Sequence, residues 1–209
     1  DLIWTVTGTA PSSLACASAT SSMTLTIDAS PIATAGPNDD ICVGDIYSLS
    51  AATAANQVSV LWTTSGDGTF SNVSATSLNP DYTPGVLDIA AGTVDLTLTA
   101  TGNAPAGSPC ATSSSTMTLT IHQVPTAIAG SNDNVCAGSN YILSGTSANG
   151  TGAWTTSGDG TFTNASSVTS DYIPGPLDII AGTVDLIWTV TGTAPSSLAC
   201  ASATSSMTL

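Results

Sequence analysis

The nine residues Trp62-Thr-Thr-Ser-Gly-Asp-Gly-Thr-Phe70 return without a change as Trp154 to Phe162. Ser-Gly-Asp-Gly between two short β-rich runs predicts strand, tight turn, strand, because Gly supplies the backbone angles that such turns need. Trp62 and Trp154 are large and mostly apolar, so we expect them to lie between two packed sheets. Two copies in matching surroundings indicate an array of one small β-domain.

A longer repeat contains the short one. Residues 1–25 recur unchanged at 185–209, an offset of 184 residues. We therefore divide the chain into residues 1–27, the last two strands of a truncated repeat, and two full repeats at 28–121 and 122–209. A segment of 27 residues is too short to bury a core. We expect it to pack on the missing part of its own domain or on a neighbouring copy.

Composition favours an all-β, secreted protein. The chain of 209 residues has no Lys or Arg, its 14 acidic residues give a net charge of −14, and Thr, Ser, Val, Gly and Pro abound. This charge argues against binding to nucleic acid or insertion into an anionic membrane, and no apolar run reaches the roughly 18 residues of a membrane helix. Without a signal peptide or an initiator Met, the sequence is predicted to be an internal piece of a longer chain.

Seven short strands in each full repeat, separated by turn signals, predict tandem immunoglobulin-like β-sandwiches. Strand alternation and size select the aromatic residues expected in the cores. These are Trp4, Trp62, Trp154, Trp188, Tyr82 and Tyr172.

One pattern extends through both full repeats: Ala-Gly-x-Asn-Asp-x-x-Cys-x-Gly, then Tyr-x-Leu-Ser, then Trp, then Asp-Ile-x-Ala-Gly-Thr-Val-x-Leu. It resembles the polycystic-kidney-disease-type (PKD-like), immunoglobulin-like repeats of giant Bacteroidetes surface proteins, including SprB-like gliding-motility adhesins. The resemblance covers the whole chain. It implies an exported, extracellular filament or stalk, often sent through type IX secretion, and it carries no catalytic residues.

Five cysteines indicate an oxidising, extracellular setting. Cys42 and Cys136 precede the second strand of their repeats, whereas Cys16, Cys110 and Cys200 lie in the long tip before the last strand. Counting favours pairs within a repeat, Cys42–Cys110 and Cys136–Cys200. Sandwich topology puts these positions at opposite ends of one domain and so favours Cys42–Cys200, a bond between consecutive domains. Both pairings stay open at this point.

Metal binding and catalysis have little support in the sequence. The weak candidate Ca²⁺ ligands are Asp39, Asp40, Asp67, Asp133 and Asp159, although Asp in Gly-rich and Asn-rich turns usually caps its own backbone. The single histidine, His122, is expected to be a solvated residue of the joint between repeats. No nucleophile or acid–base motif surrounds it, so we predict that the protein is not an enzyme and has no cofactor other than Ca²⁺ as a candidate.

Three N-glycosylation sequons begin at Asn72, Asn149 and Asn164. The predicted function is mechanical: a cell-surface stalk whose partners are neighbouring repeats of the same chain, with other copies in a filament as a further candidate. One alternative is a carbohydrate- or ice-binding adhesion module that uses the Thr-rich strand faces. The other is a filament subunit whose segment 1–27 completes another chain's sandwich by strand exchange.

Overall fold

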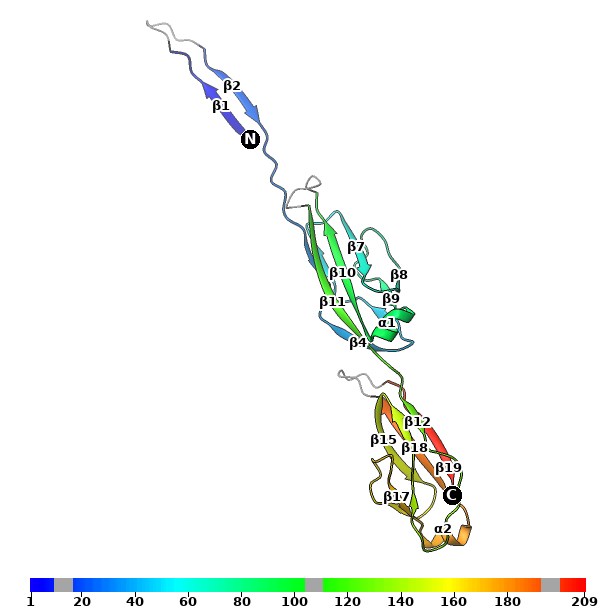
Figure 1. Ribbon diagram of the computed structural model, residues 1–209. Coiled ribbons are helices and arrows are strands. Elements are labelled where there is room, and N and C mark those ends of the chain that lie inside the picture. Colours follow the sequence, from blue (N-terminus) through cyan, green and yellow to red (C-terminus); the bar gives the residue numbers. More distant parts are fainter. Residues whose placement is uncertain (10–16, 104–110, 193–199) are drawn as a thin grey trace.

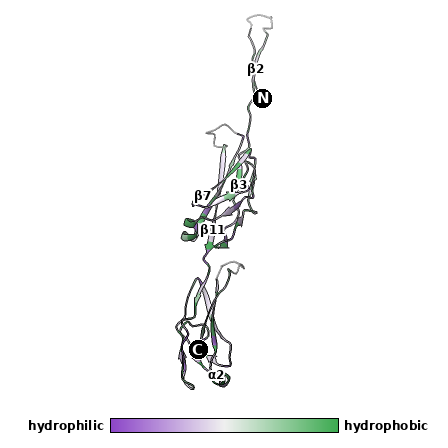
Figure 2. Cartoon of the chain, turned by 90° about the vertical axis from the view of Figure 1, so that its right-hand side faces the viewer, coloured by the Kyte–Doolittle hydropathy of each residue, from purple (hydrophilic) through white to green (hydrophobic). Residues whose placement is uncertain are grey.

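The computed structural model describes residues 1–9, 17–103, 111–192 and 200–209. Figure 1 shows an elongated molecule with three parts in sequence order: a thin hairpin, a first sandwich and a second sandwich. Figure 2, turned by 90°, shows the same end-to-end order. The long axis of the molecule therefore follows the order of the repeats.

The hairpin at the N-terminal end pairs only with itself. Strand β1 (Leu2–Val6) runs antiparallel to β2 (Ala19–Met23), with Leu2 opposite Met23 and Trp4 opposite Ser21. Every residue of both strands is exposed. The hairpin thus has backbone pairing but no core.

The first sandwich has two layers. One is a four-stranded sheet in the order β4-β11-β10-β7, and the other is formed by two short groups, β3-β6 and β5-β9-β8. The strands are β3 (Ile32–Thr34), β4 (Asp39–Cys42), β5 (Tyr47–Ser48), β6 (Thr53–Ala55), β7 (Ser59–Thr64), β8 (Thr69–Ser71), β9 (Asp81–Thr83), β10 (Thr93–Thr101) and β11 (Thr112–His122).

The first strand of this sandwich changes layers. Its beginning, β3, pairs antiparallel with β6, whereas its continuation, β4, pairs parallel with the end of β11 in the opposite layer. This layer change, together with the antiparallel β7-β10-β11 order, is the pattern of an immunoglobulin-like sandwich. The chain is thus all-β apart from two one-turn helices, α1 (Val86–Ala91) and α2 (Pro176–Ala181), as the sequence predicted.

The second sandwich repeats this plan. Its groups are β12-β14, β13-β17-β16 and β15-β18-β19. Their bounds are β12 (Thr126–Ile128), β13 (Tyr141–Ile142), β14 (Thr146–Ala148), β15 (Gly150–Thr156), β16 (Thr161–Phe162), β17 (Asp171–Ile173), β18 (Asp185–Gly192) and β19 (Ala203–Thr208). Within the described part of this repeat, the counterpart of β4 is not a strand; one hydrogen bond joins the N–H of Asp133 to the carbonyl of Thr208 over 3.2 Å.

Each sandwich buries its own apolar cluster. The first cluster contains Trp62 and Tyr82, and the second contains Trp154, Tyr172 and Trp188. Alternation along the central strands explains this, because every second residue of β10 and β18 faces inward and is buried.

Trp4 is the exception among the expected core residues, since its side chain is 72% exposed. The prediction of a core position was wrong because the other strands that a sandwich needs do not lie beside β1, whose one partner in the described chain is β2.

The two cores fill the same space with different residues. In the first, Trp62 lies opposite Leu98 and Val60 opposite Ala100. In the second, Trp154 lies opposite Trp188 and Gly152 opposite Val190. A Cβ atom on Gly152 would collide with the ring of Trp188, so the larger ring on β18 depends on the missing side chain on β15.

Candidate functional site

The repeated Ser-Gly-Asp-Gly turn closes over a buried carboxylate. Asp88, in the first turn of α1, accepts hydrogen bonds from the N–H groups of Asp67 at 3.2 Å and Gly68 at 3.0 Å. It also accepts one from the Tyr82 hydroxyl at 2.6 Å and one from the Gly85 N–H at 3.0 Å. Four donors around one buried carboxylate make this a fully satisfied polar centre.

The turn's own aspartate completes the arrangement in the opposite direction. Asp67 Oδ1 accepts the N–H groups of Leu87 at 3.0 Å and Asp88 at 3.3 Å, at the N-terminus of α1. Two aspartates thus exchange backbone donors between turn and helix, and each carboxylate lies where free N–H groups favour negative charge. Gly66 is required here because a Cβ atom would collide with the Asp88 carboxylate.

The hydrogen bonds decide the charge of Asp88. Burial acts to raise its pKa, but the bonds from Tyr82, Gly85, Asp67 and Gly68 outweigh burial and hold the pKa below its usual value. Burial and the bond to Asp88 together raise the pKa of Tyr82 to about 12. The centre therefore holds a carboxylate anion and a neutral phenol at neutral pH.

The second sandwich contains the same centre. Tyr172 donates to Asp178 over 2.6 Å, Gly175 over 2.9 Å and Asp159 over 3.2 Å. Asp159 in turn accepts the N–H of Asp178 at 3.3 Å. Hydrogen bonding again lowers the pKa of Asp178 against the effect of burial, and the pKa of Tyr172 is raised to about 12.

These contacts occupy the candidate calcium ligands. Asp67 and Asp159 bind helix N-termini, as described above. Asp39 and Asp133 each accept an adjacent N–H and a tyrosine hydroxyl, from Tyr47 and Tyr141 respectively. Asp40 contacts His122. Among the described residues, no group of three or more His, Cys or acidic side chains is placed to hold a metal ion.

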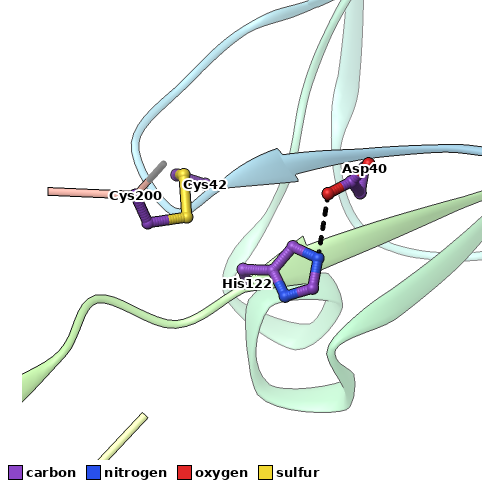
Figure 3. Close-up of a disulfide and its surroundings, with 4 residues drawn as sticks. All are labelled: Asp40, Cys42, His122 and Cys200. Atoms are coloured by element: carbon purple, nitrogen blue, oxygen red, sulfur yellow. Dashed lines mark ion pairs between the residues drawn. A yellow bond between two sulfur atoms is a disulfide. The ribbon is translucent and has the colours of Figure 1, made fainter. Parts of the chain in front are cut away.

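The joint between the sandwiches is covalently closed. Cys42 at the end of β4 and Cys200, just before β19, form a disulfide with a Cα–Cα distance of 5.6 Å across 158 residues of sequence. Figure 3 shows this bond beside Asp40 and His122. Of the two pairings left open by the sequence, the structure has the one between domains.

The intradomain pairs Cys42–Cys110 and Cys136–Cys200 are therefore wrong, since Cys42 and Cys200 are already used. The reason is topological: the turn after β4 lies at the end of the first sandwich that faces the second one (Figure 1). Cys136 is a free, exposed thiol. Cys16 and Cys110 lie outside the described residues.

His122 is part of this joint and not the solvated linker residue that the sequence suggested. It ends β11, opposite Cys42 in the parallel ladder, and its Nε2 lies 3.1 Å from Asp40 Oδ2 (Figure 3). Neither atom has a hydrogen bond of good geometry within the described chain. We regard the contact as an ion pair that forms when the imidazole is protonated.

Short-range bonds fix the chain as it leaves the first sandwich. The carbonyl of His122 accepts the N–H of Val43 at 2.9 Å, and the Gln123 amide donates to the carbonyl of Ile89 in α1 at 2.6 Å. On the far side, Asn149 donates to the carbonyl of Val124 at 3.1 Å. Both ends of the short connection are thus tied to the folded units that it links.

The three sequon asparagines all have structural partners. Asn72 and Asn149 adopt left-handed backbone angles, with φ of 59° in each case. Their side-chain amides donate to Asp81 and Val124, while Asn164 Oδ1 accepts the N–H of Ser166. Glycan attachment at Asn72 or Asn149 would remove an amide proton that now takes part in a bond.

Comparison with known proteins gives distant structural likeness only. No protein-family model matches the chain, and no curated protein is similar to it in sequence. Among solved structures, human CDH23 EC21-23 has 15% identity and a TM-score of 0.48, covering 88% of this chain and 65% of that one. The D00-D0 domain of intimin has 13% identity and a TM-score of 0.43, covering 85% of this chain and 96% of its own.

The structural likeness concerns the fold alone, tandem β-sandwich domains. Sequence reasoning found the turn and the tryptophans but missed the centres at Asp88 and Asp178. The available signal was the Pro-Gly-x-Leu-Asp segment that recurs at the same distance after each Ser-Gly-Asp-Gly turn. No helix of the described chain is long and apolar enough to cross a membrane.

Proposed function

We propose that this chain is a structural repeat region of an extracellular cell-surface adhesin, in which folded units joined end to end give length and stiffness. The observation that carries the proposal is the disulfide Cys42–Cys200, which closes a joint between two complete sandwiches. A protein that only needed two independent binding modules would have no use for a covalent bond that fixes their relative position.

The geometry of the joint supports stiffness. The disulfide lies on one side of the connection, and the Gln123–Ile89 bond anchors the connection itself to α1. Two attachments at different points oppose bending more strongly than a single flexible linker, because a hinge requires free backbone rotation between the units. Reach then increases with the number of units, as in other repeat proteins.

The composition supports an extracellular location and the adhesin parentage implied by the resemblance. A structural disulfide persists in oxidising compartments. A surface without Lys or Arg and with a net charge of −14 keeps such chains apart by repulsion and gives trypsin-like proteases no site. We place the chain in a gliding-motility-type surface filament on these grounds, with neighbouring repeats as its partners.

Calcium at the joint is a weaker part of the same hypothesis. The nearest carboxylate, Asp40, already contacts His122 at 3.1 Å. The disulfide supplies the rigidity that an ion would otherwise give. We therefore expect the unfolding temperature to be the same in calcium and in a chelator.

The exposed hairpin favours one second candidate, strand exchange. Residues 1–25 match 185–209 in sequence and in strand register, since Leu2–Met23 corresponds to Leu186–Met207. The uncovered face of Leu2, Trp4 and Val6 would therefore fit a half-sandwich like residues 122–184. However, exchanging hairpins between two complete chains leaves the same number uncovered, so it buries no additional surface.

That balance makes array completion the stronger reading of the hairpin, with the acceptor strands in an adjacent stretch of polypeptide. Sedimentation of the full chain over a wide concentration range separates the two candidates. The array hypothesis predicts a monomer throughout. Concentration-dependent polymers that disappear in Trp4→Asp but persist in Ile3→Asp, on the opposite face of β1, would support exchange instead.

The stiffness itself is testable by small-angle X-ray scattering. We expect the oxidised chain to give a narrow distribution of distances between the sandwiches, and the double variant Cys42→Ser/Cys200→Ser to give a broader one. Cys136→Ser is the matched control, because it removes a thiol that takes no part in the joint. Identical scattering from the oxidised chain and the double variant would refute the mechanical role of the disulfide.

A further inference from the structure

The free thiol of Cys136 occupies the same local structure as the bonded thiol of Cys42. Both cysteines belong to an Asn-Asp-x-x-Cys-x-Gly segment. In each case the cysteine carbonyl accepts the N–H three residues later, from Asp45 at 3.1 Å and from Ser139 at 3.0 Å. Both turns contain a glycine with positive φ, 97° at Gly44 and 84° at Gly138.

The same side-chain bond supports both turns. Tyr47 donates to Asp39 over 3.1 Å, and Tyr141 donates to Asp133 over 3.2 Å. Cys136 is thus presented by the second sandwich in the way that Cys42 is presented by the first. The difference lies in what covers them, because Cys42 is buried against Cys200 whereas Cys136 is exposed.

The surface around Cys136 has room for a partner. A hollow of about 160 Å³ adjoins the thiol and is lined by Val135, Pro174, Ile179 and Leu209 among others. On the first sandwich, the counterpart of Ile179 is Ile89, whose carbonyl accepts the Gln123 amide from the connection to the next unit. The end of the second sandwich therefore has the features of a docking face with nothing docked on it.

We propose that Cys136 is one half of a second interdomain disulfide, formed with the hairpin-tip cysteine of a sandwich of the first kind in a second copy of this chain. The inference rests on the proposed array function and names its partner. The Cys42–Cys200 bond sets the rule that a cysteine after the first strand bonds the tip cysteine of the following unit. The 184-residue period puts a unit of the first kind after one of the second kind.

The corresponding tip cysteine in the sequence is Cys110, which lies outside the described residues. Bond formation removes two protons and two electrons from the two thiols. A low-molecular-weight disulfide such as oxidised glutathione accepts them by thiol–disulfide exchange and is released as two thiols. Residues 24–31 form no helix and, apart from that, no strand, so the hairpin at that end of the first sandwich can turn aside as the second copy docks.

The test uses the full chain in a glutathione redox buffer at increasing protein concentration, followed by intact mass under non-reducing conditions. We expect disulfide-linked dimers and longer oligomers, which are lost in Cys136→Ser and retained in Cys16→Ser. Cleavage before Asp separates residues 133–158 from 95–132, and the oligomers should contain these two peptides joined through Cys136.

Two outcomes would overturn the proposal. One is oligomers that persist in Cys136→Ser, and the other is a Cys136 that carries only glutathione or is joined to another Cys136 or to Cys16. Because Cys136 is exposed and outside both cores, its replacement by Ser should leave the fold intact, which unchanged thermal unfolding would show. Failure here would leave the Cys42–Cys200 joint standing, since X-ray scattering tests that separately.

Discussion

Residues 1–25 and 185–209 have the same sequence and two different fates. Both fold as antiparallel hairpins in the same register, with Trp4 opposite Ser21 and Trp188 opposite Ser205. Yet the Trp4 side chain is 72% exposed and that of Trp188 is 1% exposed. The difference arises entirely from the chain that lies beside each hairpin.

Strand pairing is therefore encoded locally in this sequence, whereas burial requires an acceptor. A two-stranded hairpin alone is marginally stable in water. The acceptor, residues 122–184, contributes the neighbouring strand β15, the Gly152 position that admits the Trp188 ring and the buried carboxylate centre at Asp178. Each of these contributions can be removed separately.

The largest expected effect comes from making one substitution at both equivalent sites. Trp188→Ala should lower the free energy of unfolding of the second sandwich by about 3–5 kcal/mol, as expected for loss of a large buried aromatic residue. Trp4→Ala should change stability by less than about 0.5 kcal/mol, because the ring is exposed. Urea unfolding measures both, and similar losses from the two variants would mean that the hairpin is buried in solution.

Filling the space under Trp188 should have the next largest effect. In Gly152→Ala the new methyl group would collide with the indole ring, and we expect a loss of about 2–3 kcal/mol from overpacking. Trp188→Leu restores the residue found at the equivalent Leu98 and should relieve the collision. A double-mutant cycle should therefore show strong favourable coupling, whereas additive losses would contradict the packing described.

Removing one donor from the carboxylate centre should cost less. Tyr172→Phe deletes the hydroxyl that donates to Asp178 over 2.6 Å, and we expect a loss of about 1–2 kcal/mol because the carboxylate keeps its backbone donors. Tyr141→Phe is the matched control, since Tyr141 donates to the exposed Asp133. Thermal unfolding should show a clear shift for Tyr172→Phe only, and equal shifts would assign no special weight to the buried centre.

The pH dependence should be the smallest effect near neutrality and should grow at both extremes. The pKa of Asp178 is lower in the folded chain than in the unfolded chain, so its stabilisation is present above about pH 4 and is lost as pH falls through the folded pKa. The pKa of Tyr172 is raised to about 12, so its contribution is present below about pH 10 and is lost as pH rises through 12. Asp178→Asn should flatten the acid limb, and an unchanged acid limb would contradict this assignment.

The sequence predicted those parts of the fold that depend on local pattern. Alternation along β10 and β18 predicted the core, and the Ser-Gly-Asp-Gly turn joins β7 to β8 and β15 to β16 where expected. The carboxylate centre was missed because Asp67 and Asp88 are 21 residues apart, and no local pattern shows that their backbones exchange hydrogen bonds. Trp4 was misassigned because burial depends on strands that the segment does not contain.

The disulfide lay between these cases. Counting cysteines within a repeat favoured the wrong pairs, while tracing the strands to opposite ends of the sandwich favoured Cys42–Cys200. His122 was misassigned for a related reason, since the parallel pairing of β4 with β11 extends the last strand into the residue assigned to the joint. Both features depend on how the first strand changes layers, which is a property of the assembled sandwich.

Disulfide connectivity tests the account most directly, and the chain is suited to it. Cleavage before Asp under non-reducing conditions separates the peptide of Cys42 from those of Cys110, Cys136 and Cys200. A stapled joint predicts residues 40–44 linked to residues 185–209 by one disulfide in the monomer. Linkage of Cys42 to Cys110 with Cys136 to Cys200, or a free Cys42 in the oxidised monomer, would contradict a covalently fixed joint.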